Sequence, residues 1–405
     1  MTTSKRPAPT TSTPSSLLIT LAAMFALAVA MGVGRFAFTP MFPLMLRAGR
    51  LSLDAGAVLA SSNYLGYWLG AMSAHRIKLS AERLLTLGLA SIVLVTVGMA
   101  ATTSLEVWIV LRFLAGVLSA WALIATSAWG LGWLAAKGCP QLAGVLFSGV
   151  GLGIAAVGIY CMLAAQPRIT VEMLWAGLAL LAALAALLPV VVSRRHPAPD
   201  MRHATMARPK TQAHAPVATR GLVLSYGLLG FGYILPATYL PTLARQLVDN
   251  PQVFGWAWPL FGLAAALSTV IVARWIHNGN RLHAWALAHL VMALGVLLPI
   301  IWFSLTSIVL AALLVGGTFM VITMLAMQEA RIRAELNATQ VLAQMTAGFA
   351  VGQLMGPVVS ALLSRCVANH ATALSCALTL AASGLIVSAI YLWRLARQTQ
   401  YAINH

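Results

Sequence analysis

Acidic residues are scarce in this chain: Asp and Glu together number eight among 405 residues, against 25 Lys and Arg. All charged residues make up only 8% of the sequence, while 60% of it is hydrophobic. A water-soluble domain of this length could not hide so much apolar surface, so lipid must be its solvent. The low charge content therefore excludes a soluble globular protein and indicates a membrane protein.

Cysteine is also rare. The four cysteines, Cys139, Cys161, Cys366 and Cys376, form neither a metal-binding spacing nor a disulfide framework. We expect free packing thiols, with a bridge between the last two as the alternative. The chain has no Gly-x-x-x-x-Gly-Lys-Ser/Thr motif, which excludes an ATP-driven pump unless a partner supplies the ATPase. No cofactor and no metal site are expected.

Long apolar segments recur along the chain, each of about 20 residues, which is the length of a helix that crosses a bilayer. The sequence therefore predicts an all-α membrane protein with twelve transmembrane helices. Their predicted bounds are 17–46, 53–75, 83–102, 107–134, 140–165, 171–193, 220–247, 251–275, 283–303, 306–328, 338–363 and 371–393.

The basic residues predict the orientation. With both termini in the cytoplasm, the inner loops and tails hold 18 of the 25 Lys and Arg residues and the outer loops hold five. The opposite topology would invert that ratio, against the positive-inside rule. We expect a multi-pass protein of the inner (cytoplasmic) membrane. The formal charge of +17 needs no nucleic-acid partner, because it serves orientation and attraction to anionic lipid.

A segment rich in Pro, Arg and His divides the apolar segments six and six, and nothing in it could build a core. We interpret this segment as a cytoplasmic linker. The predicted organisation is a cytoplasmic tail 1–16, a six-helix bundle 17–193, the linker 194–219, a second six-helix bundle 220–393 and a cytoplasmic tail 394–405.

The two halves align at a nearly constant offset. Arg76 and Arg274 are 198 positions apart, and Gly149 and Gly348 are 199 apart. Two six-helix bundles of like topology, related by a pseudo-two-fold axis, form the transporter arrangement that places a binding site between the halves.

Several strings resemble the major facilitator superfamily, and more closely its uncharacterised YbfB/YjiJ-type branch. These strings are 32–40 (GVGRFAFTP), 63–67 (NYLGY), 147–153 (FSGVGLG) and 346–357 (TAGFAVGQLMGP). The resemblance implies that helices one, four, seven and ten line a central cavity, and that the halves rock to give alternating access. The loop after the second helix departs from the pattern, because Ala74 stands where the superfamily has Asp, although Arg76 keeps the basic part. Arg76 is thus a gating candidate without the usual salt bridge.

Arg35 is the first candidate for function. It lies within the first predicted helix, roughly 16 Å from the outer end. An Arg in the bilayer costs at least about 2.5–3.5 kcal/mol, so it must face a cavity or a partner. All eight acids fall in loops or at helix ends. We interpret Arg35 as the residue that binds an anionic ligand; the alternative is that it bonds carbonyls freed by Pro40 and Pro43.

Tyr233 takes the position of Arg35 in the second half, on a helix broken by two prolines, so we expect the two residues to face each other. Other substrate-binding candidates are the polar and aromatic residues Asn63, Tyr64, Trp121, Tyr226 and Gln353. Aromatic residues are also common anchors at membrane interfaces, which is the alternative for them.

Two further residues are candidates for coupling or gating. Arg112, in an Arg-x-x-x-Gly string on helix four, resembles a superfamily motif tied to proton handling; its alternative is a contact with Glu106 or a backbone carbonyl. Glu329 is the acid nearest the predicted cavity and could carry a proton, although its basic neighbours favour an ordinary ion pair. His289 is expected to be a packing residue.

Glycines spaced four apart, Gly149 with Gly153 and Gly348 with Gly352, predict close helix packing within a monomer, with dimerisation through these rows as the alternative. The leading interpretation is a secondary active transporter for a small organic solute, expected to be anionic, coupled to a proton or driven by the solute's own gradient. Its partners are the solute and the lipid bilayer. One alternative is a multidrug or amphiphile efflux carrier. A membrane-embedded enzyme or a transport-inert sensor would need a His/Asp cluster or an added domain that the sequence does not show.

Overall fold

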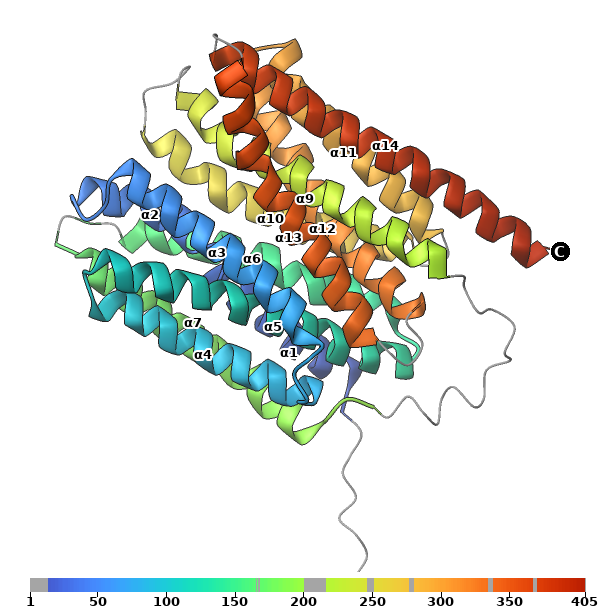
Figure 1. Ribbon diagram of the computed structural model, residues 1–405. Helices are drawn as coiled ribbons and strands as arrows, with labels where there is room; N and C mark the ends of the chain where they lie inside the picture. The colour runs from blue at the N-terminus through green and yellow to red at the C-terminus, as the bar shows by residue number, and fades with distance from the viewer. Residues whose placement is uncertain are drawn as a thin grey trace, which may run out of the picture.

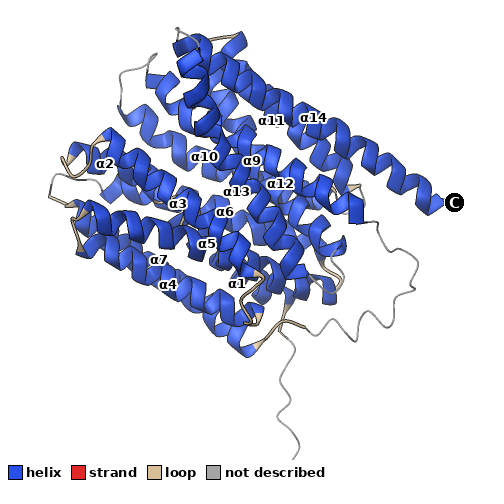
Figure 2. Ribbon diagram, in the orientation of Figure 1, coloured by secondary structure: helices blue, strands red, loops and turns tan. Residues whose placement is uncertain are grey.

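The computed structural model describes residues 14–164, 166, 168–199, 216–245, 251–276, 280–333, 338–366 and 370–404, and they form helices joined by short loops (Figure 2). Within these residues, ten helices are long and apolar enough to cross a membrane. The expectation of an all-helical membrane protein is therefore confirmed. Helices α3 and α9 do not belong to the ten, and α3 carries polar residues such as Asn63 in its middle.

The helices lie close to their predicted positions. Their bounds are α1 Ser16–Leu27, η1 Ala28–Val33, α2 Phe38–Arg47, α3 Leu53–Ala74, α4 Ala81–Ala101, α5 Leu105–Ala136, η2 Pro140–Leu142, α6 Ala143–Ala164, α7 Val171–Arg195, α9 Pro216–Arg245, α10 Pro251–Trp275, α11 Arg281–Ile301, α12 Leu305–Arg333, α13 Ala338–Cys366 and α14 His370–Asn404.

The largest difference is at the carboxyl end. The sequence predicted a helix that ends at 393 and a tail from 394, but α14 continues to Asn404. The added residues include neither Pro nor Gly, so the helix can continue after its apolar part has ended. Parts of the predicted amino-terminal tail and linker, 1–13 and 200–215, lie outside the described residues.

Figure 1 shows the helices in two groups that lie side by side, α1 to α7 in one and α9 to α14 in the other. Most packing is within a group, for example α3 on α5 and α9 on α13. Two helix pairs make the main contacts between the groups: α6 packs against α10, and α3 packs against α13. We call these two interfaces between the groups the α6–α10 seam and the α3–α13 seam. The centre of the molecule lies between them.

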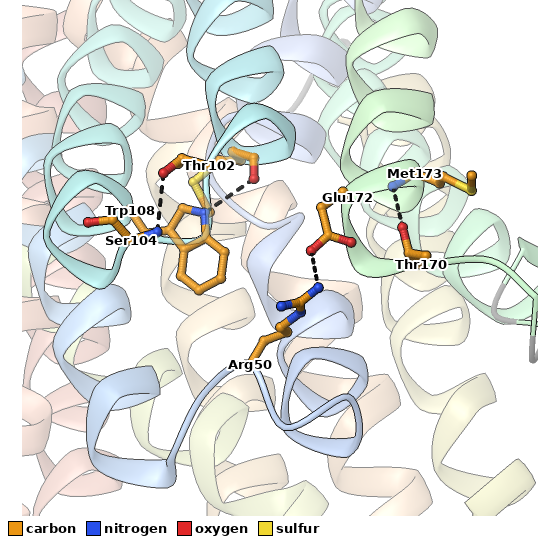
Figure 3. A network of polar contacts seen from close by, with 8 residues as sticks. Arg50, Thr102, Ser104, Trp108, Thr170, Glu172 and Met173 are labelled. Atoms are coloured by element: carbon orange, nitrogen blue, oxygen red, sulfur yellow. Dashed lines mark hydrogen bonds and ion pairs between the residues drawn. The ribbon is translucent and has the colours of Figure 1, made fainter.

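Polar contacts fix the helix ends far from the linker (Figure 3). The Thr170 hydroxyl accepts a hydrogen bond from the Met173 N–H at 3.3 Å and so caps the start of α7. Arg50, after α2, forms an ion pair of 2.8 Å with Glu172 in the first turn of α7. The indole of Trp108 on α5 donates to a backbone carbonyl of α4 at 3.2 Å.

Glycines determine how closely the helices approach. A Cβ atom added at Gly153 of α6 would lie 2.8 Å from the Cα of Ala28 in η1. A Cβ added at Gly352 of α13 would lie 2.9 Å from the backbone nitrogen of Phe231 in α9. Both predicted glycine rows therefore pack within the monomer, each on the first long helix of its own half.

Candidate functional site

Arg35 lies where the first long helix is interrupted. The π-helical turn η1 is closed by hydrogen bonds that span five residues, from the Gly34 N–H to the Val29 carbonyl at 3.1 Å and from the Phe36 N–H to the Met31 carbonyl at 2.9 Å. Residues 34–37 then form turns before α2 begins. Such a bulge takes backbone groups out of the regular helix pattern and is frequent at functional sites.

The Arg35 guanidinium links the two groups of helices. Its Nη2 donates to the Oε1 of Gln353 on α13, and the Gln353 Nε2 donates to the hydroxyl of Tyr233 on α9 at 3.3 Å. The carbon Cζ of Arg35 lies 3.5 Å from the ring centroid of Tyr67 on α3, a cation–π contact. Arg35, Gln353 and Tyr233, all candidates from the sequence, are thus joined by two consecutive hydrogen bonds. Gln353 lies between Arg35 and Tyr233, which were expected to face each other.

The guanidinium is buried but only partly satisfied. Arg35 is 3% exposed, and within the described residues its Nε and Nη1 have no hydrogen-bond partner. The ion pairs found within these residues are Arg50–Glu172 and Arg333–Glu329, so neither involves Arg35. The alternative drawn from the sequence, in which Arg35 bonds freed carbonyls, does not describe its observed partners.

Arg112 on α5, rather than Arg35, bonds the backbone carbonyls of this turn. Its Nη1 donates to the carbonyl of Gly34 at 3.4 Å and its Nη2 to the carbonyl of Arg35 at 3.1 Å. The side chain of Asn63 on α3 donates in turn to the carbonyl of Arg112 at 2.9 Å. Glu106, the other partner considered, accepts a hydrogen bond from Ser104. Arg112 therefore holds the turn from which Arg35 projects.

The remaining substrate-binding candidates have different partners. The Tyr64 ring lies 5.9 Å from the Arg35 Cζ, and the buried Tyr226 donates to the Thr323 hydroxyl at 3.2 Å. The indole of Trp121 donates to the hydroxyl of Ser73 at 3.0 Å and joins α5 to α3.

The other coupling and gating candidates lie outside this centre. Glu329 forms an ion pair of 2.9 Å with Arg333 one turn later on α12, as its basic neighbours suggested. Arg76 is exposed in the turn after α3. His289 is fully buried and accepts a hydrogen bond from Trp285 on its own helix at 3.3 Å, which fits a packing residue. All four cysteines are free thiols.

Sequence reasoning missed a contact at the end of the molecule where the linker begins, which we call the linker end. Arg331 of α12 donates through Nη1 to the Ala128 carbonyl of α5 at 3.1 Å, and Gln328 donates to the Pro140 carbonyl at 3.3 Å. Both bonds join the two groups of helices. The sequence holds little signal for them, because a backbone carbonyl acceptor leaves no trace in residue type.

Sequence reasoning also missed an aromatic cluster beside Arg35. The rings of Tyr233, Phe319 and Phe349 have centroids 4.5 to 6.3 Å apart, and the planes of Phe319 and Phe349 are tilted by 17° and 19° from that of Tyr233. Phe36, next to Arg35, meets the Phe319 ring edge-on at 6.3 Å. In the sequence, these phenylalanines cannot be distinguished from other apolar residues of a membrane helix.

Comparison with known proteins identifies the family of this chain. A protein-family model described as "Uncharacterised MFS-type transporter YbfB" matches residues 27–393. The chain belongs to this family of the major facilitator superfamily (MFS), as its sequence strings indicated. The crystal structure of the human organic anion transporter MFSD10 (TETRAN) is similar in fold, with a TM-score of 0.72 and 16% identity, over 94% of this chain and 100% of that one. No curated protein matched the sequence.

Proposed function

We propose that the protein is a secondary active transporter that carries a small organic anion across the membrane by alternating access. One observation carries the proposal: the buried Arg35, between the two groups of helices, has two nitrogens without a partner among the described residues. A transporter of this family needs a site that both halves reach, and the chain from Arg35 through Gln353 to Tyr233 spans them.

The free energies of the contacts around Arg35 support an anion as the further partner of its guanidinium. A hydrogen bond to a charged group contributes about 1.5–3 kcal/mol, and a desolvated cation–π contact about 2 kcal/mol. Arg35 has one acceptor and one close ring face, while its unpaired N–H groups have lost their water. A carboxylate can accept two parallel bonds from a guanidinium and neutralise its charge. The name of the similar human transporter is consistent with this substrate class, although at 16% identity the likeness concerns the fold.

The proposed topology follows the sequence. Twelve helices cross the inner membrane in two six-helix bundles related by a pseudo-two-fold axis, with both termini in the cytoplasm, and the transporter acts as a monomer. Transport is coupled to a proton or driven by the solute's own gradient. Because Arg112 holds the carbonyls of Gly34 and Arg35, its proposed role is to position the binding guanidinium.

The gate at the linker end uses backbone acceptors. In place of a salt bridge after the second helix, where Ala74 replaces the acid, Arg331 and Gln328 of α12 bind carbonyls of the other half. Arg331 also reaches Gly132 closely, since a Cβ added there would lie 3.0 Å from its Nη2. These bonds close the linker end and must break for the substrate to leave or enter there.

The decisive experiment replaces Arg35 by Gln, which removes the charge and keeps a side chain that forms hydrogen bonds. We expect uptake of radiolabelled organic carboxylates into proteoliposomes to fall at least about 100-fold, equal to about 2.7 kcal/mol of lost binding. Protein yield and thermal stability should stay near normal, because the variant removes a poorly satisfied buried charge.

The matched control is Arg397→Gln, an exposed arginine on α14, which should transport as the unaltered protein does. Normal carboxylate uptake by Arg35→Gln would contradict the proposal. Uptake of lipophilic cations, unaffected by Arg35→Gln, would instead favour the amphiphile efflux carrier.

A further inference from the structure

The surroundings of Arg35 carry information on the shape of its anion. Four rings surround the guanidinium: the Tyr67 centroid lies 3.5 Å from the Arg35 Cζ, the Phe36 centroid lies at 5.7 Å, and the Tyr64 and Phe349 centroids both lie at 5.9 Å. Small organic anions such as hydroxy acids would need several polar partners here. Rings offer apolar faces and one π-electron surface for the cation, so much of the surroundings of the guanidinium is aromatic.

The rings beside Arg35 are arranged as faces. Tyr233 of α9 stacks on Phe319 of α12 at 4.5 Å and on Phe349 of α13 at 5.8 Å, and Tyr226 lies over Phe349 at 5.2 Å with a tilt of 30°. These four rings come from three helices of the second half, which Figure 1 places near the centre. Offset face-to-face packing is a geometry that aromatic pairs favour, and a flat aromatic ligand can adopt the same geometry.

Ring contacts between the two halves are edge-to-face rather than stacked. Tyr67 meets Phe349 at 6.4 Å and 72°, and Phe36 meets Phe319 at 6.3 Å and 83°. These edge contacts are longer than the stacked contacts within the second half. When the halves separate, the edge contacts are lost first, and the ring faces of the second half are left opposite the guanidinium of the first.

We propose that the transported anion is a flat aromatic carboxylate, whose carboxylate binds the free nitrogens of Arg35 and whose ring stacks on the Tyr233–Phe319–Phe349 cluster. This inference rests on the proposed function and specifies its substrate class. The Arg35 Cζ and the Phe349 centroid are 5.9 Å apart, a separation that a carboxylate attached directly to a stacked ring can bridge. Gln353 and the Tyr233 hydroxyl border the same point and orient the carboxylate.

The test compares three probes on the purified full-length protein by thermal shift and calorimetry. Benzoate has the charge and the flat ring, cyclohexanecarboxylate has the charge and a puckered ring, and benzamide has the flat ring without charge. We expect benzoate to stabilise the protein and to bind at least about tenfold more tightly than cyclohexanecarboxylate, with no measurable benzamide binding.

Substitutions in the ring cluster test whether the preference for benzoate arises there. Phe349→Leu and Phe319→Leu keep apolar volume but remove the ring faces, so the preference for benzoate over cyclohexanecarboxylate should fall to near unity. Because this preference is a ratio measured within one protein, a modest loss of stability does not disturb it. Phe303→Leu, at a residue that is 49% exposed, is the matched control and should keep the full preference.

The outcomes separate this inference from the proposed function. Equal binding of benzoate and cyclohexanecarboxylate, both lost in Arg35→Gln, would overturn the aromatic class and leave the anion transporter standing. Stabilisation by lactate but not by benzoate would do the same. Benzamide binding as tightly as benzoate would overturn both, as would the absence of binding by benzoate, cyclohexanecarboxylate and lactate at millimolar concentration.

Discussion

The two seams between the halves are built in different ways. Where α6 meets α10, three glycines spaced seven apart, Gly144, Gly151 and Gly158, let the backbones come close. A Cβ added at Gly151 would lie 2.5 Å from the backbone nitrogen of Ala266. Where α3 meets α13, the rings of Tyr67 and Phe349 are 6.4 Å apart and meet edge-on.

The difference indicates how the molecule can move. Backbone contacts at a glycine row cannot yield without a shift of a whole helix, so the α6–α10 seam acts as a closely fitted surface. At the α3–α13 seam the contact between Tyr67 and Phe349 is made by side chains, so the two helices can separate without a clash of backbones. The hydrogen bond from Arg35 to Gln353 belongs to the α3–α13 seam, since Gln353 is on α13. The site is therefore built at the seam whose ring contact is made by side chains.

The largest effect on stability is expected from Gly151→Ala. The new methyl group would press on the backbone of Ala266, where no side chain can turn away, and we expect a loss of about 1–3 kcal/mol. Thermal unfolding of the purified protein measures this loss. An unchanged melting temperature would show that the α6–α10 seam is looser than its glycine row indicates.

A smaller effect, on binding, is expected at Arg112. Arg112→Lys keeps the positive charge but cannot bridge the carbonyls of Gly34 and Arg35 as a planar guanidinium does. We expect benzoate affinity to fall about tenfold, equal to about 1.4 kcal/mol, as measured by calorimetry. Unchanged affinity in this variant, together with a loss in Arg112→Gln, would mean that the charge itself binds the anion.

At the linker end, Arg331→Gln should weaken the closure between α12 and α5. Loss of its bond to the Ala128 carbonyl should raise the maleimide labelling rate of Cys139 about fivefold, equal to about 1 kcal/mol. Cys139 is half-buried beside Pro140, and the exposed Cys366 provides an internal standard. Arg333→Gln breaks an ion pair within α12 alone, so a similar rise in that variant would contradict a specific role for Arg331.

The smallest effect is expected from Gly317→Ala on α12. A Cβ atom added there would have no neighbour within 4 Å, so the change should not destabilise the protein, and the higher helix propensity of Ala should stabilise it by about 0.5–1 kcal/mol. The variant is matched to Gly151→Ala, since both add one methyl group to a helix. If Gly317→Ala destabilised the protein as much, glycine would matter in these helices for a reason other than packing.

Much of the fold follows from patterns along the chain. Hydropathy located the helices because each one must be apolar over the thickness of a bilayer, whatever its neighbours are. It did not locate the end of α14, since the residues after 393 are mostly polar yet still helical. The glycines four apart predicted packing within a monomer, whereas the row at Gly144, Gly151 and Gly158 went unnoticed.

Of the site, Arg35, Gln353 and Tyr233 could be identified because charged and polar residues are rare in lipid-embedded helices and need a reason to be there. Tyr67, Phe319 and Phe349 could not, because an aromatic residue in such a helix is equally suited to lipid, to a core or to a ligand. For Trp121, only the tertiary structure showed that its polar partner is Ser73 on a neighbouring helix.

The sequence by itself determined that this protein is a helical membrane transporter of its family and that a buried guanidinium lacks an acidic partner. Only the tertiary structure decided which groups surround that guanidinium: Gln353 is 318 residues away along the chain, and Phe349 lies on the same distant helix. The physical reason is that solvation acts on each segment separately. Ring stacking and hydrogen bonds depend instead on which faces of distant helices meet.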